Sequence, residues 1–220
     1  MGSTALFPCF HPSRWAIFQS VKSMAAFTPK QDVIVRACFD LVSAKGLKAL
    51  TTKGLARALK VTEPALYRHF KSKNDILYAI LCRMENDNRV LRGVFLKKAL
   101  PALDKLESMY LATYRMFAEN PALATAMLSE DLFQENKRLC AKVLGIQNVT
   151  LQTIVQIVRD GVKKKHVRKD VPPEDIALLV MGTMRFVALR WRLSGCGPDL
   201  IPQVQSSWRA LKTLLKTSKR

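Results

Sequence analysis

The chain has 220 residues, and 49% of them are apolar, which is enough to bury a sizeable core in one large domain or two small ones. Its 36 Lys and Arg outnumber 17 Asp and Glu and give a formal net charge of +19, which favours polyanionic partners such as nucleic acid, acidic proteins or an anionic membrane surface. No apolar run is long enough to span a membrane, and the common nucleotide-binding, metalloprotease and hydrolase motifs are absent, so we expect neither a membrane protein nor an enzyme.

The first 28 residues predict no regular element. They carry aromatic residues such as Phe7 and Trp15, but prolines at Pro8 and Pro12 interrupt every apolar run, and no signal-peptide core is present. One hypothesis is that the natural start is Met24 and that the preceding residues are an over-called start. The other is a flexible basic arm. We expect disorder in either case.

The first predicted helix begins at Pro29. Residues 28–31 (Thr-Pro-Lys-Gln) form a capping box with proline at the first helical position. Apolar residues then recur at helical spacing from Ile34 to Val42, and Gly46 is expected to end the helix in a left-handed cap. This helix is expected to support the two that follow.

Residues 51–73 predict two short helices joined by a tight turn. Thr51 or Thr52 can cap the first, and Thr62 can cap the second, with Pro64 in its first turn. The apolar residues of each helix fall on one face: Leu55, Ala56 and Leu59 in the first, Leu66 and Phe70 in the second. A helix pair of this size is typical of the helix-turn-helix unit, whose outer surface suits a DNA groove.

The run from Val61 through residues 66–73 (Leu-Tyr-Arg-His-Phe-Lys-Ser-Lys) closely resembles the DNA-binding domain of tetracycline-repressor-type (TetR-family) regulators. The close resemblance covers about residues 29–84, and the rest matches in length and helical character. It implies an all-α fold, with an N-terminal three-helix helix-turn-helix domain (29–84) and a larger C-terminal helical ligand-binding and dimerisation domain (97–220). Lys60 departs from the family, which often has glycine at this turn position.

The resemblance also implies which residues contact DNA. These are Thr52, Lys53, Thr62, Glu63, Pro64, Ala65, Tyr67, Arg68, His69 and Lys73. Elementary chemistry agrees in part. Lys73 opens a helix, so its ammonium and the free N–H groups can meet one phosphate. Lys53 can donate to guanine, Glu63 can accept from cytosine N4, and Ala65 offers a methyl contact.

Longer helices are predicted beyond this unit. Residues 72–75 (Ser-Lys-Asn-Asp) resemble a capping box and begin a fourth helix that runs to about Leu96 and links the two parts of the molecule. Pro101 marks the boundary. The remaining predicted helices cover about 102–119, 121–134, 136–164, 173–194 and 199–216.

The last two helices predict a dimer interface. Residues 176–184 are apolar almost all round, as expected of a helix buried on every side, with one side facing the core and the other a partner subunit. The final helix has a 3-4-3-4 spacing typical of a coiled-coil seam, formed by Ile201, Val204, Trp208, Leu211 and Leu215. The alternative is that this seam packs on its own domain. The resemblance also implies a homodimer, which should prefer a palindromic DNA site.

The middle segments are rich in large, adaptable side chains suited to an apolar pocket. The candidate pocket residues are Tyr110, Tyr114, Phe117, Met127, Met184 and Arg185. Tyr110 and Tyr114 share one helix face, so both hydroxyls could point into one cavity, and Arg185 could pair an acidic ligand. The alternative is an ordinary helix-bundle core, and the pocket rests mainly on the family, whose second domain usually encloses a ligand.

Five scattered cysteines indicate free thiols in a reducing cytoplasm, and neither a metal site nor a cofactor is expected. Cys38 is expected to be a small buried apolar residue. The basic run 163–169 is either a solvated loop or a contact for nucleic acid or an acidic ligand.

The predicted function is a DNA-binding transcriptional regulator, a repressor released by a small-molecule effector. The alternative is a nucleoid-associated factor of the same fold that binds DNA and recruits a protein partner without an inducer. In either case we expect it in the cytoplasm, at the bacterial nucleoid.

Overall fold

The computed structural model describes residues 28–45, 49–97, 99–119, 121, 124, 128, 136–197 and 199–217. The N-terminal extension to residue 27 and Met127 lie outside the described residues. So does most of the predicted helix 121–134, of which residues 121, 124 and 128 are helical. The predictions for these segments therefore stay predictions.

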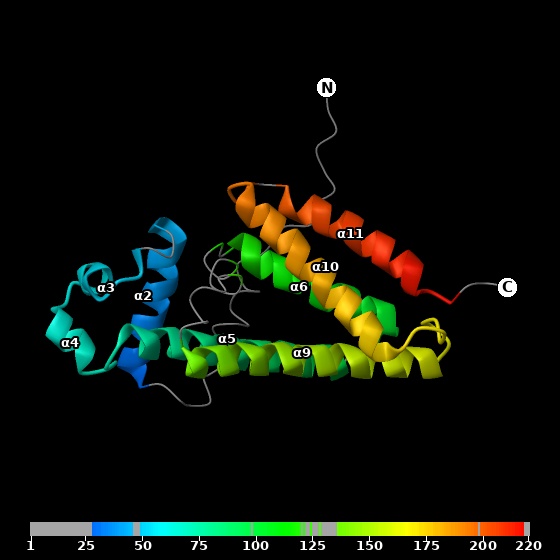
Figure 1. Ribbon diagram of the computed structural model, residues 1–220, viewed down its shortest axis with the longest axis horizontal. Coiled ribbons are helices and arrows are strands. Elements are labelled where there is room, and N and C mark those ends of the chain that lie inside the picture. The colour runs from blue at the N-terminus through cyan, green and yellow to red at the C-terminus, as the bar shows by residue number, and fades with distance from the viewer. Residues whose placement is uncertain are drawn as a thin grey trace, which may run out of the picture.

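Helices account for the regular structure of the described ranges, which confirms the predicted all-α class (Figure 1). They are α2 (Pro29–Lys45), α3 (Thr52–Leu59), α4 (Glu63–Tyr67), α5 (Lys73–Lys97), α6 (Ala102–Glu119), α9 (Lys137–Lys163), α10 (Pro173–Leu193) and α11 (Leu200–Leu215). Where the predicted ends can be compared, they agree to within one or two residues, because proline and capping residues mark most of them.

The small end of the molecule is built from α2, α3, α4 and the first half of α5 (Figure 1). Its core gathers one buried face from each helix, including Cys38, Leu55, Leu66 and Ile80. Cys38 is fully buried, and burial raises the pKa of its thiol to about 12. It is therefore a small apolar core residue, as the sequence predicts.

The larger part consists of α6, α9, α10 and α11, with α5 lying along α9 (Figure 1). The helix α10 packs on α9, and α11 packs on α6 and α10. In the last turn of α9 there is no room for a side chain at Gly161, because a Cβ there would lie 2.6 Å from atoms of Ala102 and of Val167. The helix α5 belongs to both parts, since it also packs against α2 and α6.

The seam on α11 lies inside the chain. Val204, Trp208, Leu211 and Leu215 are all at most 8% exposed, and Ile201 is half-buried. The ring of Trp208 lies 5.2 Å from that of Tyr110 on α6. The prediction that this seam forms the dimer interface is therefore wrong. A 3-4 spacing shows that a helix face is covered, but not whether the cover comes from the same chain or from a second copy.

None of the helices in the described ranges combines the length and the apolar character that crossing a membrane requires.

Candidate nucleic-acid interface and effector cavity

The helix α3 begins and ends on defined local bonds. The hydroxyl of Thr51 accepts a hydrogen bond from the N–H of Gly54 at 2.9 Å, so Thr51 is its N-cap. At its other end, Lys60 adopts a left-handed backbone with φ 55°. That conformation favours glycine, the residue that the family often has here, and Lys60 adopts it although a side chain is present. Lys53 is exposed on the outer face of α3.

The short helix α4 presents the other predicted contacts. Thr62 caps it by accepting from the N–H of Ala65 at 3.3 Å, and Pro64 occupies its first turn. Leu66 and Phe70 are buried beneath it, as predicted. The outer surface therefore carries the exposed Thr62, Pro64, Tyr67 and Arg68 and the half-buried Glu63, Ala65 and His69. The structure places these predicted residues on one surface, and their contacts with DNA remain predictions.

A hydrogen bond that sequence analysis did not predict joins the two helices. The Thr52 hydroxyl donates to Oε2 of Glu63 at 3.0 Å and joins the start of α3 to the start of α4. A hydroxyl has one proton to donate, so Thr52 cannot also donate to a phosphate while this bond is made. The bond also orients the Glu63 carboxylate, whose second oxygen remains an acceptor for a base edge.

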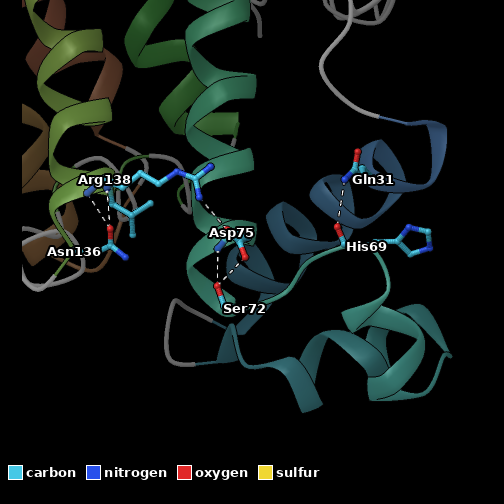
Figure 2. Close-up of polar contacts among 7 residues, drawn as sticks. Gln31, His69, Ser72, Asp75, Asn136 and Arg138 are labelled. Carbon is cyan, nitrogen blue, oxygen red and sulfur yellow. Dashed lines mark hydrogen bonds and ion pairs between the residues drawn. The ribbon is translucent and has the colours of Figure 1, made fainter.

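Two further networks hold this surface (Figure 2). The predicted capping box at the start of α2 is confirmed, because Thr28 and Gln31 exchange hydrogen bonds of 3.0 and 3.3 Å. The side-chain amide of Gln31 also donates to the carbonyl of His69 at 3.3 Å, which fixes the end of α4 against α2. The imidazole of His69 points away from this bond and stays on the outer side (Figure 2).

The start of α5 has the second predicted capping box. The N–H of Asp75 donates to the Ser72 hydroxyl at 3.2 Å, and that hydroxyl donates back to Oδ2 of Asp75 at 3.0 Å. Lys73 is the first residue of the helix, and its side chain lies outside the described part of the chain. Its position confirms that it opens α5, as its predicted phosphate contact requires.

A cavity of about 700 Å³ lies among α5, α6, α9 and α10. Its lining is mainly apolar and includes three of the predicted pocket residues, Phe117, Met184 and Arg185. The side chains that sequence analysis missed come mostly from α5 and α9, among them Met84, Asn88, Arg92, Val143 and Gln147. The sequence offered no signal for these, because which face of α5 and α9 meets α6 depends on how the helices cross.

Tyr110 and Tyr114 are not among the residues that line this cavity. Both are buried in the core, with rings 5.1 Å apart. The Tyr110 hydroxyl bonds to that of Ser207 at 2.9 Å, and the Tyr114 hydroxyl donates to the carbonyl of Met184 at 2.7 Å. Burial raises the pKa of Tyr114 far above its usual value. Placing these two residues in the pocket was wrong, because their hydroxyls bond to α10 and α11 instead.

Two family models match the chain. One, described as bacterial regulatory proteins of the tetR family, matches residues 34–80, which span α3 and α4. The other, described as the C-terminal region of YsiA-like proteins, matches residues 94–213, more than half of the chain. The chain belongs to the tetR family of bacterial regulatory proteins. It is therefore a DNA-binding transcriptional regulator, as the sequence predicts.

Relatives and solved structures of similar fold include several named proteins. The nucleoid occlusion factor SlmA of Aliivibrio fischeri (strain MJ11) is 33% identical over 139 residues, which cover 60% of this chain and 67% of SlmA. SlmA of Vibrio vulnificus (strain YJ016) is 30% identical over 152 residues, covering 66% and 74%. The fatty acid degradation regulator FadR of Bacillus halodurans has a TM-score of 0.75 at 21% identity, over 86% of this chain and 97% of that one.

A second structure shares the fold at similar strength. It is the transcriptional regulator FadR of Bacillus subtilis in complex with stearoyl-CoA, with a TM-score of 0.71 and 20% identity, over 84% of this chain and 97% of that one.

Within the residues that the structure describes, no group of three or more His, Cys, Asp and Glu could hold a metal ion.

Proposed function

We propose that this tetR-family regulator is a homodimeric repressor that binds a palindromic operator in the bacterial nucleoid and is released by a mainly apolar small molecule. The cavity carries this proposal. It lies against α5, the helix that begins directly after the DNA-binding pair, so a molecule in the cavity contacts the element that positions α3 and α4. A FadR of the same fold has been crystallised with stearoyl-CoA, which supports a ligand with a long apolar part.

The lining supports the same class of ligand. Methionine side chains from α5, α6 and α10, including Met84, Met109 and Met181, give an adaptable apolar wall. Arg92 and Arg185 add two cations at its edge, which suit a molecule with an acidic group as well as an apolar body. We call α2, α3 and α4 of each subunit its DNA-binding head. Release from DNA then requires that the ligand binds more tightly when the two heads are arranged in a way that does not fit the operator.

A different face supports the homodimer. Along α10, residues 179, 182, 186, 189 and 193 follow a 3-4-3-4 spacing, and Leu179, Phe186 and Leu193 are 57%, 60% and 74% exposed. Large apolar side chains that stay exposed in one chain mark an interaction surface. We therefore place the dimer seam on the outer face of α10 rather than on the buried seam of α11. Two identical heads then meet half-sites about one helical turn apart.

One experiment tests the two parts together. Selection of bound DNA from a random pool should return a palindrome, and a compound screen should then find apolar acids that release it. The coupling should be about 1–3 kcal/mol, and the operator should weaken ligand binding by the same factor. A pool without palindromic symmetry would contradict the dimeric repressor.

A matched pair of variants tests the seam. Phe186→Glu should convert the dimer to a monomer by light scattering and should reduce operator affinity, because it places a charge in the apolar seam. Val149→Glu introduces the same charge at an exposed position of α9 and should leave the dimer intact. A dimeric Phe186→Glu variant would remove α10 from the interface.

The relatives favour a second candidate function. Several are named nucleoid occlusion factor SlmA, so a factor that binds DNA and recruits a protein partner without an inducer remains the alternative. A broad screen in which no compound shifts both the melting temperature and the operator affinity would favour it over the ligand-released repressor.

A further inference from the structure

A ladder of polar contacts joins the start of α9 to the start of α5. We call the contacts of Arg138 with Asp75 and Tyr78, and of Lys142 with Glu85, the α5–α9 ladder. Nη1 of Arg138 lies 3.0 Å from Oδ1 of Asp75, and its guanidinium lies 3.8 Å from the ring centroid of Tyr78. Nζ of Lys142 lies 2.5 Å from Oε2 of Glu85. Figure 2 shows Arg138 reaching from α9 to Asp75.

Arg138 is in an unfavourable position for its own helix. Asn136 caps α9 by accepting from the N–H groups of Arg138 and Leu139, at 3.0 and 3.1 Å, so Arg138 lies in the first turn. That turn contains no acidic residue, and the positive end of the helix dipole disfavours a cation there. The negative charge that compensates Arg138 comes from Asp75, on a different helix. A local rule that is broken in this way points to a requirement outside the helix.

Asp75 links this contact to the DNA-binding surface. Its Oδ2 accepts from the Ser72 hydroxyl, and Ser72 follows Phe70, the buried residue that closes α4, by two positions. Arg138 therefore binds the carboxylate that is hydrogen-bonded to Ser72, the residue just before α5. The same stretch of α9 contributes Cys140, Val143 and Leu144 to the cavity lining. The ladder thus runs beside residues that line the cavity and ends at the start of α5.

We propose that Arg138 is a positioning residue that fixes the angle of the DNA-binding head against α9 and so sets the half-site spacing that the operator must have. The pair is solvent-exposed, with side chains 61% and 31% accessible, so it adds little to the stability of the fold. A directed contact at the base of the head still limits its rotation. This inference rests on the proposed dimer, in which the separation of two heads depends on the angle of each.

The test uses the full-length protein and a set of palindromes whose half-sites are moved apart or together one base pair at a time. Arg138→Gln should reduce the ratio between the affinity for the best spacing and that for the other spacings. The expected reduction is about threefold if the variant affects one head of the dimer and up to about tenfold if it affects both, as expected for an exposed ion pair. Arg159→Gln is the control. It breaks another exposed ion pair of α9, with Glu174, at the end far from the head, and it changes the net charge equally.

A second pair of variants shows whether Arg138 acts through Asp75. Asp75→Asn should flatten the spacing preference as Arg138→Gln does, and Arg138→Gln added to it should cause no further change. Asp75→Asn also removes a negative charge near the DNA and can raise the affinity for every operator. Such a general rise does not change the ratio of affinities between operators of different spacing. Lys142→Gln, which breaks the second contact of the ladder, should act in the same direction.

The outcomes separate the two proposals. If the wild type prefers one spacing and Arg138→Gln keeps that preference as Arg159→Gln does, the role of Arg138 is overturned and the dimeric repressor stands. If the wild type itself shows no spacing preference, the proposed dimer on a palindrome fails, and the inference fails with it.

Discussion

The helix starts of the DNA-binding end and the helix contacts of the larger part depend on hydrogen bonds of different sequence range. In the first, the bonds that begin helices join residues three apart, such as Thr51 to Gly54 and Thr62 to Ala65. In the second, Tyr110 bonds to Ser207, 97 residues away, and Lys212 bonds to Asp104, 108 residues away. Local bonds can be read from neighbouring residue types, whereas distant bonds depend on how helices cross.

The comparison extends to what each part exposes. The outer surface of α3 and α4 is polar and basic, which suits a nucleic acid whose phosphates dominate affinity. The outer face of α10 is apolar, which suits a second protein surface. The predicted seam of α11 is core, whereas one face of α10, the neighbouring helix that the sequence also predicts to meet a partner subunit, is exposed.

The largest expected effect comes from the core of the larger part. Trp208→Ala should lower the free energy of unfolding by about 3–5 kcal/mol, because a large side chain that is 1% exposed is removed and leaves a cavity. Urea denaturation measures this. Leu214→Ala, at a 63% exposed position of the same helix, should change it by less than about 0.5 kcal/mol. Equal effects at both positions would mean that Trp208 is not core.

A smaller effect is expected at the DNA surface. Lys53→Ala should cost about 1–3 kcal/mol of operator binding and should relax the preference at one base pair, because Lys53 is exposed where it can donate to guanine. Competition against a set of single-base variants of the operator measures this. Lys216→Ala removes another exposed charge, at the end of α11 and far from α3, and should change neither affinity nor preference. Uniform weakening by Lys53→Ala would make it a phosphate contact instead.

The next largest effect is expected at Thr62, the N-cap of α4. Thr62→Ala should destabilise the fold by about 1 kcal/mol, because the N–H of Ala65 loses its acceptor. Thermal unfolding measures this. Thr213→Ala is the matched control, since Thr213 is exposed and its hydroxyl donates to the carbonyl of Arg209, one turn back on α11. A Thr62→Ala variant as stable as the control would show that local caps contribute little to this end.

The smallest effect tests the turn between α3 and α4. Lys60→Gly should raise the free energy of unfolding by less than about 1 kcal/mol, since relief of the left-handed strain is partly offset by the greater freedom of glycine in the unfolded chain. Ala58→Gly, in the same helix at an ordinary helical position, should lower it by about 1 kcal/mol. A destabilised Lys60→Gly variant would mean that the lysine side chain itself supports the turn.

Short stretches of sequence were sufficient to predict the helix ends and to identify the DNA-binding unit. Thr28, Thr62, Ser72 and Pro173 mark starts because capping and proline preferences act over three or four residues. The family pattern around residues 66–73 identified the DNA-binding unit for the same reason, because it is one short, continuous stretch of sequence.

Which apolar faces are core, which are open and which surround the cavity depends on how the helices pack in three dimensions. The spacing of α11 and that of α10 are equivalent in sequence, yet Trp208 is buried against Tyr110 while Phe186 is 60% exposed. Periodicity records that a face is apolar. It does not record which helix covers that face, because the crossing of α6, α10 and α11 depends on the packing of all three. The contact of Arg138 with Asp75, 63 residues apart, is invisible in the sequence for the same reason.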